Sequence, residues 1–527
     1  MIYIDSRRCA SGKTRDGLPT AIIDKPNIHN KGIELSTWAL IKTRYELGDR
    51  VLVVLPSLLL LDDYEQEFTD YMLSEGVNIK NQLKVLSSKT TNNVQLELNN
   101  ALFARTMIII ITQAAFLESE ILSGQRTWQA HRSNELEDGV TEFTEGYHLI
   151  IDEAIEPYRE LQYYHEKDCK VNFDWAENST MCEAPDLAVE WKQILFSDNL
   201  RGNGITDGSE VIRAMSNKNW QSRMLEPDYK KFIGVVERAK RVSIIQELKP
   251  EIFSHWMSVW VAAANFEVTF MRYWMDAHNL AWEIRPKLEF VPHTTPVLIT
   301  GNGDCDFKWS SYKQQNEPEL IQQFADIATP IVGDEPVLVL RNSGENKIYQ
   351  KIITVTDEQG NQRQVEQEHK VPHNCAGGNQ WRHIKFVSLE SALNPTPKLN
   401  EFLYSVYGIS TKGNINGATR DLVHMARTVY TFYQTVMRSC LRENQPATVL
   451  CLDNRVILGL AEFFDNIELN EFVLSRKDVQ PVGRPEKENK LSNTESKQAR
   501  RLRLRFPDLA HMTNEELIVK WRNKELA

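Results

Sequence analysis

The fold of this chain is decided by its first fourteen residues, Met1-Ile-Tyr-Ile-Asp-Ser-Arg-Arg-Cys-Ala-Ser-Gly-Lys-Thr14. The apolar start predicts a buried strand, and the small residues that follow predict a tight loop. Such a loop can bind phosphate through backbone N–H groups, with the Lys13 ammonium on the β- and γ-phosphates and the Thr14 hydroxyl on Mg²⁺. Arg7 stands where the usual spacing has Gly, so a helix start with an exposed lysine is the alternative. The candidate phosphate-binding residues are Ala10, Ser11, Gly12, Lys13 and Thr14.

A second motif lies about 140 residues downstream, at Tyr147-His-Leu-Ile-Ile-Asp-Glu-Ala154. Its apolar run predicts a strand that ends in two carboxylates. Asp152 offers the hard oxygen ligand that a nucleotide-bound Mg²⁺ needs, and Glu153 can polarise the water that attacks the γ-phosphate. An Asp-Glu pair alone is also typical of a solvated strand end. Together with the phosphate loop, it predicts an ATP site.

The composition is that of a globular protein, with 527 residues of which 42% are hydrophobic and 25% are charged. This length allows two to four domains. The seven cysteines are scattered, which argues against a disulfide framework or a zinc site. We find no signal peptide and no apolar run of the ~20 residues that a membrane span needs, so a soluble, cytoplasmic protein is expected.

Strands and helices alternate along two blocks of the sequence. This alternation is typical of α/β folds, in which a parallel sheet is covered by helices on both faces and ligands bind at the carboxyl ends of the strands. We therefore expect two tandem parallel sheets. The strands predicted after the first span residues 50–57, 84–87, 106–112, 147–152 and 258–265 in one block, and 296–300, 336–342, 383–387 and 448–452 in the next.

The alternation sets the expected domain boundaries at residues 1–280, 281–472 and 473–527. Within the first domain, residues 157–255 break the pattern and are rich in Trp and charged residues, which we interpret as a mostly helical insertion. Aromatic residues there could stack on unpaired bases, but the core of a small helical domain is the favoured interpretation.

The C-terminal segment is basic although the chain as a whole carries a net charge of −11. Residues 476–527 contain 13 Lys and Arg against 8 Asp and Glu. Four arginines there could contact nucleic-acid phosphates, with a steep dependence on salt; an ordinary solvated charge run and a docking tail for a protein partner are the alternatives. These residues are Arg500, Arg501, Arg503 and Arg505.

The order of the motifs resembles that of the superfamily 2 helicases, the DExx-box group with two tandem RecA-like domains. The resemblance covers roughly residues 1 to 460. Motifs I to VI of that family are matched by Arg7–Thr14 (I), Leu55–Ser57 (Ia), Ile111–Gln113 (Ic), Asp152–Ile155 (II), Ala262–Phe266 (III), Leu340–Ser343 (IV), Ala376–Asn379 (V) and Tyr433–Arg442 (VI).

The resemblance implies roles for residues of the second domain. Gln434, Arg438 and Arg442 recur every four residues and so share one face if the segment is helical; the arginines would act as fingers on the γ-phosphate. Arg442 lies one residue later than the second arginine of the family pattern. Gly378 would contribute to nucleotide binding. The residues expected to contact a nucleic-acid strand are Ser57, Thr112, Gln113, Asn342, Ser343 and Asn379.

These observations predict an α/β protein with two RecA-like domains, a helical insertion and a basic C-terminal tail. The expected function is that of an ATP- and Mg²⁺-dependent DNA helicase or translocase, nearest to viral and phage replication helicases of the origin-binding-protein type. It would act on single-stranded or forked DNA in a bacterial or phage-infected cytoplasm, with replication proteins as possible partners of the tail. An RNA helicase of the same fold, and an initiator or recruiter switched by ATP, remain alternatives. The motor subunit of a restriction or defence complex is a third, for which we find no nuclease-type carboxylate-lysine cluster.

Overall fold

The computed structural model describes a large part of the chain and divides it into two compact units, Met1–Leu474 and Ser475–Ala527. The second unit, and with it the basic segment, lies outside the described residues. The described residues are 2–4, 37–119, 122, 147–164, 179–182, 191–196, 214–215, 217–233, 241–254, 256–284, 293–304, 307, 309–342, 347–356, 362–373, 380–407, 413–415, 418–420 and 422–474.

The first sheet has seven strands, all parallel, in the order β12-β1-β11-β5-β2-β4-β3. Its strands are nearly continuous runs of Val, Ile and Leu, as expected of parallel strands buried on both faces. The strands are β1 (Ile2–Ile4), β2 (Arg50–Leu55), β3 (Leu83–Leu86), β4 (Ile108–Thr112), β5 (Tyr147–Asp152), β11 (Ser258–Ala262) and β12 (Trp282–Ile284).

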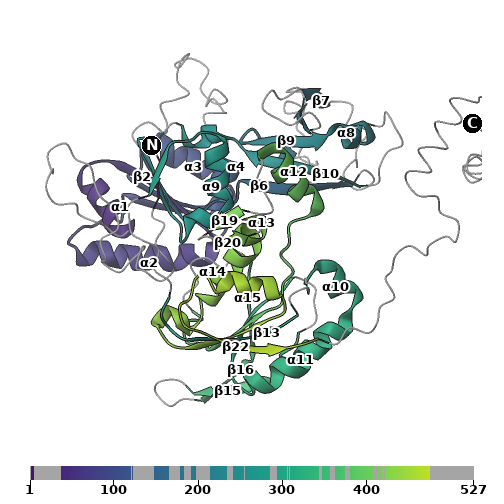
Figure 1. Ribbon diagram of the computed structural model, residues 1–527. Coiled ribbons are helices and arrows are strands. Elements are labelled where there is room, and N and C mark those ends of the chain that lie inside the picture. The colour runs from purple at the N-terminus through teal and green to yellow at the C-terminus, as the bar shows by residue number, and fades with distance from the viewer. Residues whose placement is uncertain are drawn as a thin grey trace, which may run out of the picture. The chain divides into compact units, whose positions relative to one another are not determined.

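Helices cover both faces of this sheet (Figure 1). Alternate residues of each strand point to opposite faces, so that Val51 and Val53 pack with α1 and α2, whereas Leu52 and Val54 pack with α3, α4 and α9. The helices are α1 (Thr37–Glu46), α2 (Leu58–Ser74), α3 (Val94–Phe103), α4 (Gln113–Glu118) and α9 (Phe270–Ala277). The 3₁₀ turn η4 (Phe266–Val268) precedes α9.

The second sheet has six parallel strands in the order β17-β14-β18-β21-β13-β22. Helix α11 (Pro318–Val332) packs on one face, and the helical segment from η5 to α15 (residues 425–460) packs on the other. The strands are β13 (Val297–Asn302), β14 (Val337–Leu340), β17 (Glu368–Val371), β18 (Phe386–Leu389), β21 (Ala447–Cys451) and β22 (Ile467–Phe472). Two parallel sheets in tandem were predicted from the sequence, and they are confirmed.

We refer to the described residues from 2 to 284 as the first half and to those from 293 to 474 as the second half; the other elements of the second half are helices and two hairpins. The helices are α10 (Ser311–Asn316), α11 (Pro318–Val332), α12 (Pro397–Tyr407), α13 (Leu422–His424), the π-helix η5 (Met425–Val429), α14 (Tyr430–Val436), the 3₁₀ helix η6 (Cys440–Glu443) and α15 (Asn454–Leu460). The hairpins are β15 (Ile352–Thr356) with β16 (Gln362–Glu366), and β19 (Gly413–Ile415) with β20 (Ala418–Arg420).

The prediction that residues 157–255 are mostly helical is wrong. The described part of this segment is dominated by a five-stranded antiparallel sheet in the order β6-β10-β9-β8-β7. Its charged residues pair inside the sheet, as Arg223 does with the fully buried Glu247, and these charges obscured the strand pattern. The elements are β6 (Tyr158–Tyr164), β7 (Ser179–Cys182), β8 (Trp191–Phe196), β9 (Trp220–Leu225), α8 (Glu226–Phe232), β10 (Arg241–Leu248) and the 3₁₀ turn η3 (Pro250–Phe253).

Helix α12 connects the second half of the chain to this antiparallel sheet. Although α12 lies between β18 and β21 in the sequence, its Phe402 is fully buried among residues of the first half. The Phe402 ring makes edge contacts with Tyr158 and Trp191, and Lys398 forms an ion pair of 2.9 Å with Asp228. The two halves of unit Met1–Leu474 therefore share one hydrophobic cluster.

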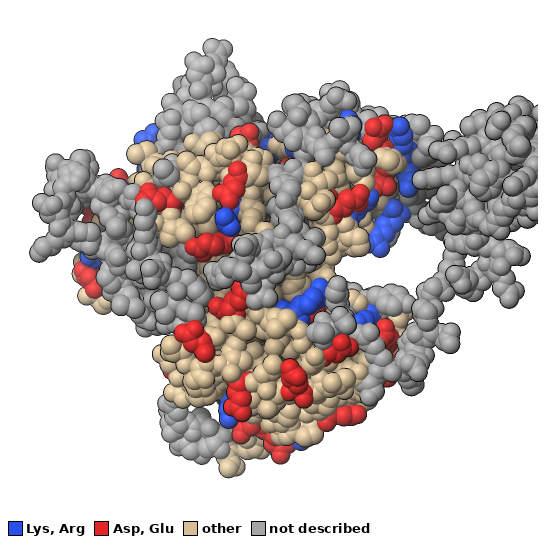
Figure 2. All heavy atoms as spheres, in the orientation of Figure 1, with Lys and Arg blue, Asp and Glu red and all other residues tan. Residues whose placement is uncertain are grey.

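The charged residues of the described part are mixed rather than segregated. On the face drawn in Figure 2, Asp and Glu lie among Lys and Arg over both halves. No described helix is both long and apolar enough to cross a bilayer.

Candidate functional site

Asp152 and Glu153 lie at the carboxyl edge of the first sheet, at the end of β5. Strand β1 ends at the same edge: Ile4 pairs with Val261 and Val261 pairs with Ile151. The ends of β1 and β5 are therefore level and two strand spacings, roughly 10 Å, apart. The predicted phosphate-binding residues 10–14 follow β1 and lie outside the described residues.

Asp152 is buried, with 6% of its surface exposed. The buried Tyr64 phenol on α2 has a pKa raised well above its ordinary value, by burial first and by the negative charge of Asp152 second. The Tyr64 hydroxyl has no hydrogen-bond partner among the described residues. Within the same residues, no group of three or more His, Cys, Asp or Glu could hold a metal ion. One carboxylate completed by nucleotide phosphates is nevertheless the oxygen donor set that Mg²⁺ accepts, so Asp152 fits the predicted role.

The backbone of Glu153 is held by the first half of the chain. Its φ of 95° is uncommon for a residue with a side chain. The Glu153 N–H donates to the Ala262 carbonyl over 3.2 Å, and the Gln113 side chain donates to the Glu153 carbonyl over 3.1 Å. Neighbouring segments thus fix the direction in which the Glu153 side chain leaves the sheet.

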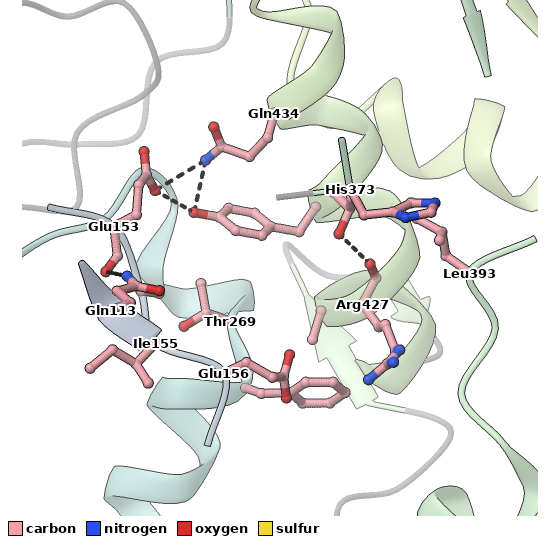
Figure 3. Close-up of a pocket in the computed structure, with 14 residues that line it drawn as sticks. Gln113, Glu153, Ile155, Glu156, Thr269, His373, Leu393, Arg427 and Gln434 are labelled. Atoms are coloured by element: carbon pink, nitrogen blue, oxygen red, sulfur yellow. Dashed lines mark hydrogen bonds between the residues drawn. The ribbon is translucent and has the colours of Figure 1, made fainter. Parts of the chain in front are cut away.

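The carboxylate of Glu153, by contrast, is contacted from the second half. Tyr430 Oη donates to Glu153 Oε2 over 3.2 Å, and Gln434 Nε2 donates to the same oxygen over 3.3 Å. Figure 3 shows Gln434 and Glu153 pointing toward each other. The sequence motifs predicted that Gln434 and Glu153 serve one site; the structure brings their side chains into contact.

The segment that carries Gln434 is not one continuous α-helix, contrary to the expectation of a single polar face. Helix α14 ends at Val436, and Arg442 lies in the separate 3₁₀ helix η6. Between the two helices, Ser439 has an extended backbone conformation, and its hydroxyl accepts a hydrogen bond from the Leu441 N–H at the start of the new turn. Arg438 is buried and donates to Gln434 Oε1 over 3.4 Å, whereas Arg442 is partly exposed.

A pocket of about 410 Å³ extends from Glu153 between residues of the two halves. Glu156 lines this pocket, and desolvation by the surrounding protein raises the pKa of its carboxyl to about 7, against the opposing effects of the Arg427 charge and of a backbone hydrogen bond. Burial lowers the pKa of His373, as do the charges of Lys370 and Arg427. The lining residues are Gln113, Glu153, Ala154, Ile155, Glu156, Thr269, Phe270, His373, Leu393, Ala426, Arg427, Tyr430, Thr431 and Gln434.

Sequence reasoning missed most of the polar residues of this pocket. Tyr430 could have been found, because it lies four residues before Gln434 and therefore shares its helix face. Arg427 could not, since it lies in the π-helix η5, whose wider turn changes the direction of the side chains. The sequence offers no comparable signal for Glu156 or His373.

The residues predicted to contact a nucleic-acid strand have varied surroundings. Ser57 and Thr112 each accept a hydrogen bond at the start of a helix, α2 and α4 respectively. Gln113 lines the pocket, and Asn342 donates to the Gln314 side chain over 2.8 Å. The remaining predicted residues lie outside the described part of the chain: Ser343, Gly378, Asn379, Arg500, Arg501, Arg503 and Arg505.

The segment that resembles motif III is buried between the two halves. Ala263 packs in the hydrophobic cluster of the first sheet, and Ala264 packs in that of the second. Asn265 has a left-handed backbone conformation, with φ of 50°. The chain after β11 thus passes from one core to the other within two residues.

Comparisons with known proteins give similarities at the level of structure only. No family model and no curated protein matches this sequence. Among solved structures, the chain is similar to S. tokodaii Xpd4, with 9% identity over 90% of this chain and 96% of that chain and a TM-score of 0.44. It is also similar to an XPD helicase, with 12% identity over 89% of this chain and 91% of that chain and a TM-score of 0.34. A third similar structure is that of the DUF1998 helicase MrfA bound to DNA and AMPPNP, with 8% identity over 89% of this chain and 49% of that chain and a TM-score of 0.34. Since these TM-scores are low, the function of the chain has to be inferred from its own residues.

Proposed function

We propose that this protein is a nucleic-acid-stimulated ATPase of the superfamily 2 helicase type, which moves along DNA. One observation carries the proposal. The carboxylate of Glu153, at the end of the first sheet, is hydrogen-bonded by Gln434 and Tyr430 from a helix that packs on the second sheet. The carboxylate that we propose as the general base, in one half, is thus in contact with the other half, as a motor that couples hydrolysis to relative movement requires.

In the proposed reaction, the oxygen of a water molecule attacks the γ-phosphorus of ATP. The water transfers a proton to the Glu153 carboxylate, while the bond between the γ-phosphorus and the β,γ-bridging oxygen breaks. ADP and inorganic phosphate leave. Mg²⁺, when bound, neutralises charge on the phosphates, and Asp152 and Thr14 are the residues that would hold it.

Residues from both halves have proposed roles around the nucleotide. Lys13 binds the β- and γ-phosphates, with the loop backbone at residues 10–12, and Gly378 contributes from the second half. Arg438 and Arg442 are proposed to stabilise the charge of the transferring phosphoryl group. The direct bond from Arg438 to the Gln434 amide supports a place for Arg438 beside the reacting groups.

The proposed motor comprises residues 1–280 and 281–472, with residues 473–527 as a basic appendage. Within the helicases, we propose a role in phage- or plasmid-type DNA replication, which is supported by the resemblance of Asp152–Ile155 and Tyr433–Arg442 to the corresponding motifs. The strand would contact polar residues at strand ends, Ser57, Thr112, Gln113, Asn342, Ser343 and Asn379, and the arginines of the appendage.

The experiment that tests this function compares Lys13→Ala with Lys80→Ala, a matched change at an exposed lysine. ATP hydrolysis is measured with single-stranded DNA, duplex DNA and RNA in parallel. We expect stimulation by single-stranded DNA in the wild type and in the control, and a loss of at least about 100-fold in Lys13→Ala because the phosphates lose their cation. Full activity in Lys13→Ala would end the proposal, and stimulation by RNA alone would make the protein an RNA helicase.

A further inference from the structure

The two ends of Glu153 are held by different halves of the chain. Its backbone N–H donates to the Ala262 carbonyl and its backbone carbonyl accepts from the Gln113 side chain, both within the first half. The described hydrogen bonds of its carboxylate come from Tyr430 and Gln434, both on α14, and both reach Oε2. The orientation of the carboxylate therefore depends on the presence of α14.

The hydrogen atoms of this network can be assigned without conflict. Arg438 donates to Gln434 Oε1, so the amide must direct its Nε2 toward Glu153. The Gln434 Nε2 group has two hydrogens, and it contacts both Glu153 Oε2 and Tyr430 Oη, the latter at 2.9 Å. The single hydroxyl hydrogen of Tyr430 is left for Glu153. Tyr430 is thus a donor to the carboxylate and an acceptor from the amide at once.

The helix geometry explains why Tyr430 and Gln434 reach the same oxygen. The two residues are four positions apart in α14 and so share one helix face. Directly before Tyr430, the π-helix η5 adds one residue to the turn and sets the direction of this face. The ring of Tyr430 packs against the hydrophobic cluster of the second sheet. The phenol hydroxyl is therefore anchored to the second half while it contacts the first.

We infer that Tyr430 is a positioning residue: it orients the Glu153 carboxylate for proton transfer only when the second half of the chain is seated against the first. The inference rests on the proposed function, because it assigns Tyr430 a role in ATP hydrolysis. It adds a residue outside the motifs that the sequence revealed. Its consequence is that hydrolysis, but not ATP binding, depends on the Tyr430 hydroxyl.

The test is Tyr430→Phe, which removes the hydroxyl and keeps the ring. Tyr404→Phe is the matched control, since Tyr404 is 61% exposed on α12. We expect kcat for DNA-stimulated hydrolysis to fall about 10- to 100-fold in Tyr430→Phe, as for the loss of one hydrogen bond to a charged group. The KM for ATP, the affinity for single-stranded DNA and the unfolding midpoint should match those of the control.

A second comparison separates positioning from a general structural role. In a Glu153→Gln background, Tyr430→Phe should not reduce the residual rate further, because the carboxylate through which Tyr430 acts is already gone. An additional loss in that background would overturn the inference. So would a Tyr430→Phe variant with an unchanged kcat, or one whose defect is confined to KM.

Failure of this inference is distinguishable from failure of the proposed function. If Lys13→Ala abolishes hydrolysis while Tyr430→Phe equals the wild type, the ATPase stands and the role of Tyr430 is overturned. If Lys13→Ala is fully active, both are overturned. Should Tyr430→Phe lower the unfolding midpoint, kcat is measured again at a temperature at which both the variant and the wild type are fully folded: a loss of kcat that persists there supports the inference, and an unchanged kcat contradicts it.

Discussion

Helix α12 provides the sharpest test of how the two halves of the chain are joined. Phe402 on this helix is fully buried, and its ring centroid lies 5.0 Å from that of Trp191 and 6.2 Å from that of Tyr158, both in the antiparallel sheet. Replacing a buried Phe with Ala removes its apolar surface and leaves a cavity, at a cost of about 3 to 5 kcal/mol. We therefore expect Phe402→Ala to lower the free energy of unfolding of this part of the molecule by that amount.

Guanidinium chloride titration followed by tryptophan fluorescence measures this loss, because Trp191 lies against the substituted ring. Tyr404→Ala is the control: it changes an aromatic residue of the same helix that is 61% exposed, and its effect should stay within about 0.5 kcal/mol. A loss below about 1 kcal/mol in Phe402→Ala would refute the packing of α12 against the antiparallel sheet.

Three further predictions concern charge. Burial lowers the pKa of His148 to about 4, whereas in the unfolded chain this imidazole takes up its proton near pH 6.5. The contribution of His148 to the free energy of unfolding is therefore largest above pH 6.5 and falls by up to about 1.4 kcal/mol per pH unit on acidification toward pH 4. Urea titrations should show a shallower fall in His148→Gln than in the wild type, and an equal fall would refute this. Arg341→Ala leaves Glu368 and Glu390 buried without the cation that they contact and should cost about 3 to 5 kcal/mol in the same assay, while a loss near zero would contradict a buried ion pair at this position. Deleting residues 476–527 should flatten the dependence of DNA affinity on salt, and an unaltered slope would assign this segment to a protein partner.

The two parallel sheets were predictable because their strands are buried on both faces. Runs such as Ile108–Thr112 and Val337–Leu340 are apolar at nearly every position, and such runs bounded by polar turns have few alternatives. The carboxylates of Asp152 and Glu153 were predictable for the same reason, since they follow an apolar strand directly.

The antiparallel sheet was not predictable, because several of its polar side chains are paired across strands inside the protein. Arg159 donates to Gln246 over 2.7 Å and stacks on Trp220, and the buried Glu247 contacts Arg223 and also His278 of the first half. In the sequence, the abundance of Trp and charged residues in this segment favoured the interpretation as helices. A contact between side chains that lie tens of positions apart in the sequence cannot be inferred from local periodicity.

The residues that line the pocket could not be predicted either, because their positions depend on contacts and helix geometry that exist only in the folded chain. Nothing in the sequence around Met425–Val429 indicates a π-helix, and a regular α-helix would direct its side chains differently. The contact between Tyr430 and Glu153 joins residues 277 positions apart, so only the folded chain reveals it.

Glu153 is proposed to activate water in an ATPase that is completed from the second half of the chain. The decisive measurement compares ATP binding and DNA-stimulated ATP hydrolysis in Glu153→Gln with those in Glu251→Gln, a matched change at an exposed glutamate. We predict that Glu153→Gln binds ATP like the control but hydrolyses it at least about 100-fold more slowly. Unchanged turnover in Glu153→Gln would contradict this role.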